Sequence, residues 1–377
     1  MTCRVPWARY THKKPPVKWQ IRVPSRKLRQ CLRAWSIGYF RSNGHSIACA
    51  GAKRENTAAG REKYYMNLAE ALPRGFEVHG YRIERTLGGG GFSIVYLATQ
   101  IDTGNQVAIK EYLPTNQAKR LEDASVESIS GESSNTFRKG IKRFFDEAAA
   151  LAKVKHPNIV HVTDFFRANN TVYLVMDYER GKDLRVYIKR HSGKLSEKFI
   201  RRVFPQLLLG LWELHKNDLL HLDIKPANIY LRPGGRPLLL DFGAARMAMA
   251  GVRPTGPHTL TLGFAPLEQH RHGDVGPWTD LYALGASMWA CMSGRAPPPS
   301  TERVLDDTLK PAVRTFGRRY SKALLQAVDW CLKMDPTQRP QTVHELLDFL
   351  NQSWIADLEQ QRGGYLERLR TILPWVR

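Results

Sequence analysis

The sequence predicts an α+β fold in which a small β-rich half with one long helix precedes a larger, mainly helical half. Two observations lead to this division. Before Gly181, short runs of β-branched and aromatic residues are separated by polar or glycine-containing turns, which is typical of antiparallel strands. After Gly181, apolar residues recur every three or four positions, which is the spacing of helices that bury one face.

The expected elements follow the chain in order. Strand-like runs cover 81–88, 95–101 and 106–113, and a DTGN turn at 102–105 joins the last two. The polar, Ser-rich stretch Glu111–Thr136 is expected to be a loop. The remaining elements are a helix at 138–154, a strand at 171–178, and helices at 201–215, 280–292, 322–333 and 344–358.

The positive charge of the chain is unevenly distributed. The 377 residues carry a formal net charge of +22, of which residues 1–65, with 15 Lys/Arg and 2 Asp/Glu, contribute +13. Any binding to an anionic surface is therefore expected mainly in this segment. We divide the chain into a basic extension (1–65), a lead-in (66–80), one domain (81–350) and a basic, helical tail (351–377).

Several interpretations of residues 1–65 remain open. The abundance of Pro, Ser, Arg and Lys favours a disordered extension, and Met66 reads as an alternative natural start just ahead of the domain. The run Lys27–Arg41 places apolar residues at helical spacing among arginines, which is typical of helices that bind membrane surfaces. Acid-poor, Arg-rich N-termini are also typical of organelle transit peptides. No specific binding to nucleic acid is predicted.

The cysteines and the apolar runs predict a soluble, cytoplasmic protein. There are five cysteines, an odd number, and no pair has the spacing of a metal or redox motif. We therefore expect reduced thiols in a reducing compartment. The longest uncharged apolar stretch, Leu281–Ser293, is shorter than the ~20 residues that a membrane-spanning helix needs.

Two motifs in the first half are suited to binding a polyphosphate. The segment Gly88–Val95 lies between two expected strands, and its glycines allow backbone N–H groups to approach phosphate oxygens closely. It is not a P-loop, because no GK[ST] follows. Lys110 ends the VAIK run on the next strand, within reach of the same phosphates. A lysine in a cleft needs a counter-charge, and Glu147 on the expected helix is the central candidate, with Asp146 beside it.

Two motifs in the second half supply charges for phosphoryl transfer. In HLDIKPANI, Asp223 is suited to accept a hydroxyl proton, Lys225 to neutralise transferring charge and Asn228 to ligate a metal. Asp241 begins DFGAAR directly after an apolar strand and would be a second metal ligand. Each motif alone is weak evidence, but their order and spacing together match a known signature set.

With these motifs the sequence resembles the eukaryotic-type (Hanks-type) serine/threonine protein kinases, over about 81–350. Segments such as VAIKEYLP and GPWTDLYALGA resemble bacterial members especially. The resemblance implies a bilobal fold, with an N-lobe at about 81–176 and a C-lobe at about 180–350. It also implies ATP and Mg²⁺ as cofactors and protein substrates as partners. Serine/threonine specificity is implied by Lys225 and by Thr261.

The resemblance assigns a role to each motif. Asp223 would be the catalytic base, with Lys225 and Asn228 completing the catalytic set, and Asn228 and Asp241 would hold Mg²⁺. Met176 would be the gatekeeper residue before the hinge. The residues implied around ATP are Leu87, Gly88, Gly89, Gly90, Gly91, Phe92, Ser93, Val95, Ala108, Lys110, Glu147, Met176, Asp177, Tyr178 and Tyr230.

Further residues are implied to support this site from within the fold. Glu268 and Arg339 would form a buried ion pair, and Asp280 would anchor the helix that carries the catalytic loop. His221 and Phe242 would pack in an internal spine.

The sequence departs from the family pattern at four points. Ser93 replaces the third glycine of the loop. Leu222 replaces the arginine that commonly binds a phosphorylated activation loop, so activity is not expected to need phosphorylation there. Leu267 stands in the usual Pro-Glu pair, although Glu268 is retained. Lys110 and Glu147 are 37 residues apart, a long interval that indicates an insertion within 111–136, open to regulatory phosphorylation.

Other function classes remain alternatives. A pseudokinase scaffold would bind nucleotide or a partner with little transfer, and Ser93 and Leu222 are the residues that leave room for it. A nucleic-acid or membrane tether formed by residues 1–65 is compatible with kinase activity. A small-molecule phosphotransferase is less favoured, because Ala265–Glu268 and Asp280 resemble the peptide-binding lobe of protein kinases.

Overall fold

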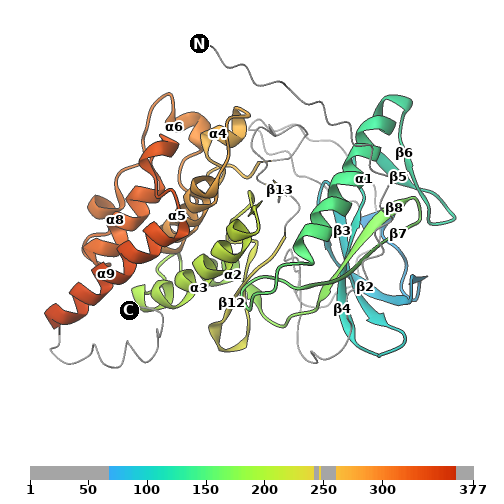
Figure 1. The fold of residues 1–377 in the computed structure, drawn as a ribbon, viewed down its shortest axis with the longest axis horizontal. Helices are drawn as coiled ribbons and strands as arrows, with labels where there is room; N and C mark the ends of the chain where they lie inside the picture. The colour runs from blue at the N-terminus through green and yellow to red at the C-terminus, as the bar shows by residue number, and fades with distance from the viewer. Residues whose placement is uncertain (1–67, 242–245, 248–259, 362–377) are drawn as a thin grey trace, which may run out of the picture. The chain divides into compact units, whose positions relative to one another are not determined.

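The computed structural model describes residues 68–241, 246–247 and 260–361, with side chains described up to 352. Within these residues the predicted division into a β-rich half and a helical half is confirmed (Figure 1). The first half is built on an antiparallel six-stranded sheet of order β1-β2-β3-β4-β8-β7. Its strands are β1 (Glu77–Val78), β2 (Tyr81–Gly89), β3 (Ser93–Gln100), β4 (Gln106–Tyr112), β7 (Val162–Ala168) and β8 (Thr171–Asp177).

The lead-in takes part in this half. A 3-10 turn, Leu68–Glu70, precedes β1, and β1 pairs with β2 through Glu77–Arg82 and Val78–Tyr81. The sheet thus begins ahead of Tyr81, the predicted start of the domain. Strand β1 was not predicted, because it has only two residues and is too short to show the alternation of apolar and polar side chains.

The prediction of a loop at 111–136 is wrong. Its first residues complete β4, a hairpin of β5 (Ala118–Arg120) and β6 (Val126–Ser128) follows, and α1 already begins at Gly131. The many serines did not prevent helix formation, because Ser130 caps α1 by accepting a hydrogen bond from the Ser133 amide at 3.2 Å. The interval between Lys110 and Glu147 is therefore long because it contains a folded hairpin.

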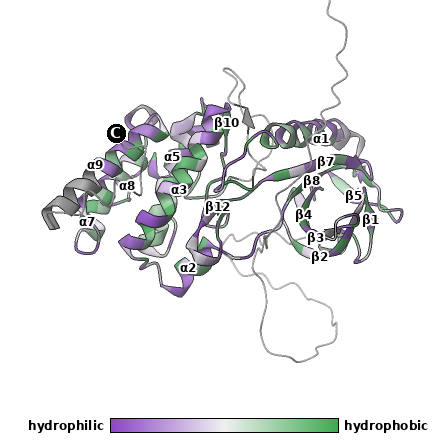
Figure 2. Ribbon diagram, turned by 60° about the horizontal axis from the view of Figure 1, so that its bottom comes forward, coloured by the Kyte–Doolittle hydropathy of each residue, from purple (hydrophilic) through white to green (hydrophobic). Residues whose placement is uncertain are grey.

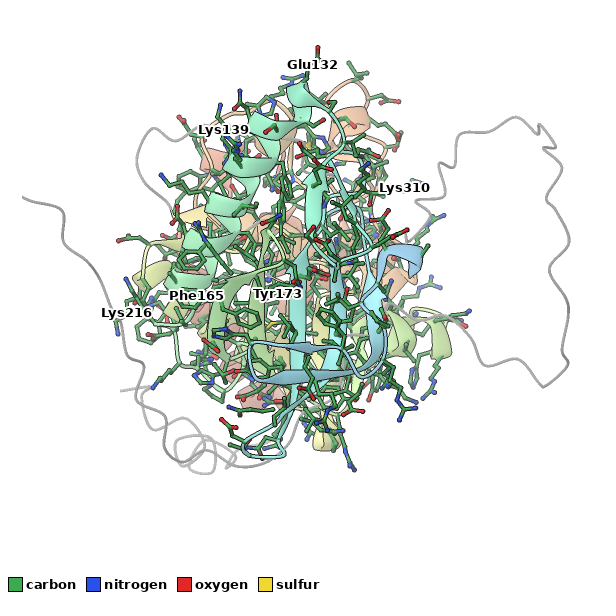
Figure 3. The ribbon with its side chains drawn as sticks, turned by 90° about the vertical axis from the view of Figure 1, so that its right-hand side faces the viewer. Glu132, Lys139, Phe165, Tyr173, Lys216 and Lys310 are labelled. Atoms are coloured by element: carbon green, nitrogen blue, oxygen red, sulfur yellow. The ribbon has the colours of Figure 1, made fainter. Side chains whose placement is uncertain are left out.

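Helix α1 (Gly131–Leu151) packs on the sheet with aromatic side chains. Tyr112 stacks on Phe137 with ring centroids 5.8 Å apart, and Phe145 meets Phe165 of β7 edge to face at 4.9 Å. Figure 3 shows Phe165 beside this helix. Gly140 is required here, since a Cβ at this position would lie 1.9 Å from the Tyr112 hydroxyl. These contacts fix the helix that carries Glu147.

The second half contains the predicted helices with shifted ends. Small sheets also lie in this half: β9 (Lys182–Asp183), β11 (Ile229–Leu231) and β12 (Pro237–Leu239) form one, and β10 (Leu219–Leu220) pairs with β13 (Arg246–Met247). The helices are α2 (Leu184–Arg190), α3 (Glu197–Lys216), α4 (Leu267–His270), α5 (Pro277–Ser293), α6 (Ser300–Arg303), α7 (Ala312–Phe316), α8 (Lys322–Cys331) and α9 (Val343–Gln361), with 3-10 turns at Pro233–Gly235 and Pro336–Gln338.

Helix α5 lies at the centre of this half. Every residue from Thr279 to Met292 is buried, which explains why its sequence lacks a polar face. By contrast, α3 carries both hydrophobic and hydrophilic residues along its length (Figure 2). Among the described helices, we find none that combines the length and the apolar character needed to cross a bilayer.

The predicted ion pair between Glu268 and Arg339 is confirmed. The guanidinium donates to the two carboxylate oxygens at 2.6 and 3.2 Å, and also to the carbonyls of Lys333 and Met334. Both partners are buried, with exposed fractions of 7% and 2%. This pair ties α4 to the segment before α9.

Replacing Arg339 with Met is expected to lower the free energy of unfolding by about 3–5 kcal/mol, because it leaves the Glu268 carboxylate buried without its partner. Equilibrium urea unfolding measures this. Arg82→Ala is the matched control, since Arg82 and Glu77 form an exposed pair and its loss is expected to cost less than about 1 kcal/mol. Equal effects of the two changes would contradict the expectation.

Candidate active site

The loop that holds Asp223 is anchored by Asp280 of α5. One carboxylate oxygen accepts the His221 amide at 2.9 Å, and the other accepts the Leu222 amide at 2.8 Å. Leu222 has a positive φ of 59°, a strained value for a leucine, so these two hydrogen bonds hold a backbone that would otherwise relax. His215 also contacts Asp280 at 2.8 Å. Although burial alone would raise it, hydrogen bonding and charge from His215 hold the pKa of Asp280 below its usual range.

Asp223 lies within a compact set of polar side chains. The Lys225 ammonium is 2.8 Å from one carboxylate oxygen of Asp223 and 2.9 Å from the Thr261 hydroxyl. Thr261 in turn donates to Asp223 at 3.2 Å. The Asn228 amide nitrogen donates to the Asp223 backbone carbonyl at 2.8 Å and to its carboxylate at 3.0 Å. The structure thus brings together the catalytic set that the motif predicted and adds Thr261.

The pKa of Asp223 is raised above its usual range. Burial is the main cause, the neighbouring Lys225 opposes it, and the charge of Asp241 adds to it. A carboxylate of raised pKa is a better proton acceptor, which is the property a general base needs.

His221 links the two acidic motifs. Its ring is fully buried, and burial lowers the pKa of this histidine, which keeps it neutral. In the neutral form Nε2 donates to the Leu240 carbonyl at 3.0 Å, while Nδ1 accepts the Asp223 amide at 3.3 Å. His221 therefore fixes Asp223 relative to the residue before Asp241. Phe242, its predicted partner in the spine, lies outside the described residues.

Lys110 lies on β4 and is buried, with an exposed fraction of 5%. Its ammonium is 2.5 Å from the Asp241 carboxylate and lies 5.8 Å from the centre of the Phe144 ring on α1. Glu147, one turn after Phe144, is half-buried, whereas its neighbour Asp146 is exposed, which favours Glu147 as the counter-charge. A direct pairing of Lys110 with Glu147 stays a prediction.

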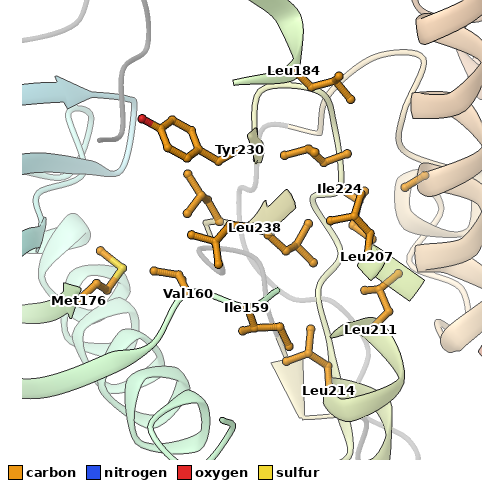
Figure 4. Close-up of a cluster of buried hydrophobic side chains, with 14 of the residues drawn as sticks. Ile159, Val160, Met176, Leu184, Leu207, Leu211, Leu214, Ile224, Tyr230 and Leu238 are labelled. Atoms are coloured by element: carbon orange, nitrogen blue, oxygen red, sulfur yellow. The ribbon is translucent and has the colours of Figure 1, made fainter. Parts of the chain in front are cut away.

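The predicted adenine-contacting residues lie on four strands, three of which are neighbours in the six-stranded sheet. Val95 of β3 is opposite Lys110, and Ala108 of β4 is opposite Met176 of β8. Tyr230 lies on β11, directly after the catalytic loop. All four apolar side chains are at most 4% exposed. Figure 4 shows Met176 and Tyr230 in one cluster of buried side chains.

The glycine-rich segment is a hairpin connection between β2 and β3. Gly88 pairs with Val95 and Gly89 with Ile94, and the Gly90 amide donates to the Ser93 carbonyl at 2.9 Å. Ser93, the substitution for the third glycine, lies opposite Tyr112 as the first residue of β3. Its side chain is accommodated as an ordinary strand residue.

The hinge, Asp177–Glu179, has an ion pair that the sequence pattern did not reveal. Arg232, after β11, donates to Glu179 at 3.0 Å and to the Pro157 and Pro237 carbonyls. Burial raises the pKa of Glu179 to about 7, although Arg232 opposes the rise. The two partners are 53 residues apart, so no local signal pointed to the pair.

Comparison with known proteins identifies the chain. Residues 81–355 match the model of the protein kinase domain. The chain belongs to the protein kinase family. The solved structure described as PpkA-294 apo form is 36% identical in sequence, covers 74% of this chain and 99% of its own, and superposes with a TM-score of 0.66. The predicted bilobal kinase fold is therefore confirmed.

Curated relatives of this kinase include bacterial members, as predicted. Serine/threonine-protein kinase PrkC from Bacillus subtilis is 29% identical over 74% of this chain and 41% of its own length. Serine/threonine-protein kinase pkn2 from Myxococcus xanthus is 30% identical over 72% and 32%. Mouse Nek3 is 30% identical over 69% and 47%. The chain spans less than half the length of these relatives.

The donor set of this kinase fits a magnesium ion. Mg²⁺ binds one or two protein oxygens together with waters and phosphate oxygens. Because the Asn228 amide nitrogen is used by Asp223, its oxygen is the atom left for a cation, and Asp241 supplies a carboxylate. Among the described residues no cluster of three acidic, His or Cys side chains offers a metal site without nucleotide.

The ionisation of Glu179 is expected to make stability depend on pH. A carboxyl group whose pKa is about 7 in the folded chain, against 4.5 ordinarily, binds more protons when folded. Its contribution is therefore present at acidic pH and lost as the pH rises from about 5 through 7. Urea unfolding measured at several pH values should show that the free energy of unfolding declines less with rising pH for Glu179→Gln than for the unchanged chain. Parallel curves would contradict this.

Proposed function

We propose that this kinase is active and transfers the γ-phosphoryl group of Mg-ATP to serine and threonine hydroxyls of proteins, with Asp223 as the catalytic base. The observation that carries the proposal is the set around Asp223. Lys225, Thr261 and Asn228 all contact its carboxylate within 3.2 Å, on a loop anchored by Asp280. These contacts hold the Asp223 carboxylate in one orientation, which suits it to orient a substrate hydroxyl.

The proposed reaction moves one proton and one phosphoryl group. The substrate hydroxyl hydrogen-bonds to Asp223 while its oxygen forms a bond to the γ-phosphorus of ATP. The bond between that phosphorus and the β–γ bridging oxygen breaks, ADP leaves, and the hydroxyl proton passes to Asp223. Lys225 offsets the negative charge on the transferring group, and Lys110 orients the α- and β-phosphates.

A bound Mg²⁺ would neutralise the β- and γ-phosphate charge that develops during transfer. We propose Asn228 and Asp241 as its protein ligands. The pairing of Lys110 with Asp241 at 2.5 Å supports the proposal, because it brings the lysine and the proposed metal ligand together.

The proposed preference for serine and threonine rests on Thr261. Its hydroxyl bridges Lys225 and Asp223, and its backbone carbonyl accepts the amides of Phe264 and Ala265. Thr261 therefore connects the segment 261–265 to the proposed catalytic base. We also propose a cytoplasmic signalling role, with residues 81–350 as the catalytic domain and the basic extension as a contact for anionic surfaces.

Asp223→Asn is expected to lower phosphorylation of the chain itself and of a generic protein substrate by about 10² or more, because the base is lost while the shape is kept. Radiolabelled ATP measures the transfer, and a fluorescent ATP analogue shows that nucleotide still binds. Asp102→Asn in an exposed turn is the control. Undetectable transfer by the unchanged chain, with nucleotide bound, would favour the pseudokinase alternative.

We further propose that activity does not require phosphorylation of the activation loop. Leu222 is buried, its amide is bound by Asp280 and its carbonyl accepts Gln269 at 2.9 Å, so this position offers an incoming phosphate no charge. Thr255 and Thr259 lie outside the described residues.

The double change Thr255→Ala, Thr259→Ala is expected to leave the kinase rate close to that of the unchanged chain, measured on phosphatase-treated protein. Thr261→Ala is the positive control and should lower the rate, because Thr261 contacts Asp223 and Lys225. A loss of about 10² in the double variant would overturn the idea.

A further inference from the structure

A buried carboxylate lies directly beside Lys110, on the other face of the sheet. Successive residues of a strand point to opposite faces, so Glu111 points away from the side on which Lys110 meets α1. Its exposed fraction is 0%. Three side chains donate to it: Tyr96 at 2.7 Å, Tyr173 at 2.6 Å and Arg120 at 2.5 Å. In Figure 3 Tyr173 lies over the middle of the sheet.

Arg120 connects this carboxylate to the hairpin and to the lead-in. Besides Glu111, its guanidinium donates to the backbone carbonyls of Glu70 at 2.6 Å and Ala124 at 2.9 Å. Its own amide donates to the Glu70 carboxylate at 2.5 Å. Tyr96 accepts the Leu72 amide at 3.1 Å. We refer to Glu70, Tyr96, Glu111, Arg120 and Tyr173 as the Glu111 network.

The same segment is hydrogen-bonded to the tip of the glycine-rich loop. Beyond β4, the Leu113 amide donates to the Phe92 carbonyl and the Thr115 amide to the Gly91 carbonyl, both at 3.0 Å. Glu70 and Gly90 line one small cavity together with Leu113 and Ala118. The hairpin residues that hold Arg120 are therefore continuous with the residues that hold the loop.

The hairpin also leads into the helix that carries Glu147. Only two residues separate β6 from α1, and Ser130 caps the helix. The Val126 amide donates to the Asn169 carbonyl, and the Asn169 side chain donates to Tyr173, which closes a ring of contacts back to Glu111. Displacing the hairpin would thus disturb the start of α1, the end of β4 and the glycine-rich loop together.

An ion pair this deeply buried is weak evidence for stability, because desolvation offsets much of the attraction. Its distinctive feature is where it lies. It clamps β4 from the face opposite the phosphate-binding side, at the residue next to Lys110. A clamp on this residue limits the positions that the lysine ammonium can take, and phosphoryl transfer is sensitive to such positions.

We propose that Arg120 and Glu111 are positioning residues that set Lys110 and the glycine-rich loop for the phosphates of ATP, which rests on the proposed function. Neither side chain touches the nucleotide. They act through β4, through the Leu113–Thr115 segment and through α1. The lead-in residue Glu70, which precedes the matched kinase domain, belongs to the same device.

The test compares two ligands that share adenine and ribose but differ in phosphates. In the full chain, Arg120→Ala is expected to weaken binding of Mg-ATP about tenfold, because a displacement of ~1 Å in a phosphate-binding group is costly. Adenosine, which has no phosphate, should bind as it does to the unchanged chain. Arg120→Lys keeps the charge and should recover part of the loss. Isothermal titration calorimetry gives both affinities.

Lys119→Ala is the matched control, since Lys119 is the exposed neighbour on the same strand and should change neither affinity. A role in folding alone would weaken both ligands equally, and that result, or no change for either, would overturn the proposal. If Arg120→Ala does not fold, Glu111→Gln keeps the shape of the network and is judged by the same ratio. Binding needs no turnover, so failure of the proposed kinase activity would leave this outcome readable.

Discussion

The arrangement of the catalytic loop depends on the buried carboxylate of Asp280. Its two oxygens bind the backbone amides of His221 and Leu222, and so hold a leucine at positive φ. Asp223 follows immediately in the chain. The positions of Asp223, Lys225 and Asn228 therefore depend on this anchor. The anchor sits on α5, which is buried from Thr279 to Met292, so the charge is tolerated only because each oxygen has partners. Without Asp280, the backbone that carries Asp223, Lys225 and Asn228 would not be held in one position.

In the β-rich half, Lys110 is held in place through its strand, β4, and not by a single buried carboxylate. Strand β4 is held from both faces of the sheet. On one face Tyr112 and Phe144 pack the strand against α1, with Gly140 making room. On the other face the Glu111 network joins the strand to the hairpin and the lead-in. A strand that is packed on both sides moves little in register, because a slip of one residue would exchange the two faces.

The sequence predicted the elements with strong periodicity and the motifs with fixed spacing. The helices at 197–216 and 277–293 were expected within a few residues, and Glu268 and Arg339 form the predicted ion pair. The hairpin at 118–128 was missed because its strands have three residues each and carry more polar than apolar side chains. Its stabilisation comes from Arg120, whose partners lie up to 50 residues away. The Glu179–Arg232 pair was missed for the same reason: long-range charge pairing leaves no local pattern.

The two halves of the site consequently differ in what holds their charges. Around Asp223 the contacts come from its own loop, from Thr261 and from the Asp280 anchor on α5. Around Lys110 the contacts join the lead-in, the hairpin and three strands. Each of these must be in place for the lysine to take its position. Leu222, which is apolar where a phosphate-binding arginine is common in the family, removes one route by which a phosphorylated loop would act on Asp223. Under the proposed function, an ordered phosphate site therefore depends on the positions of β4 and α1 as well as on the catalytic loop.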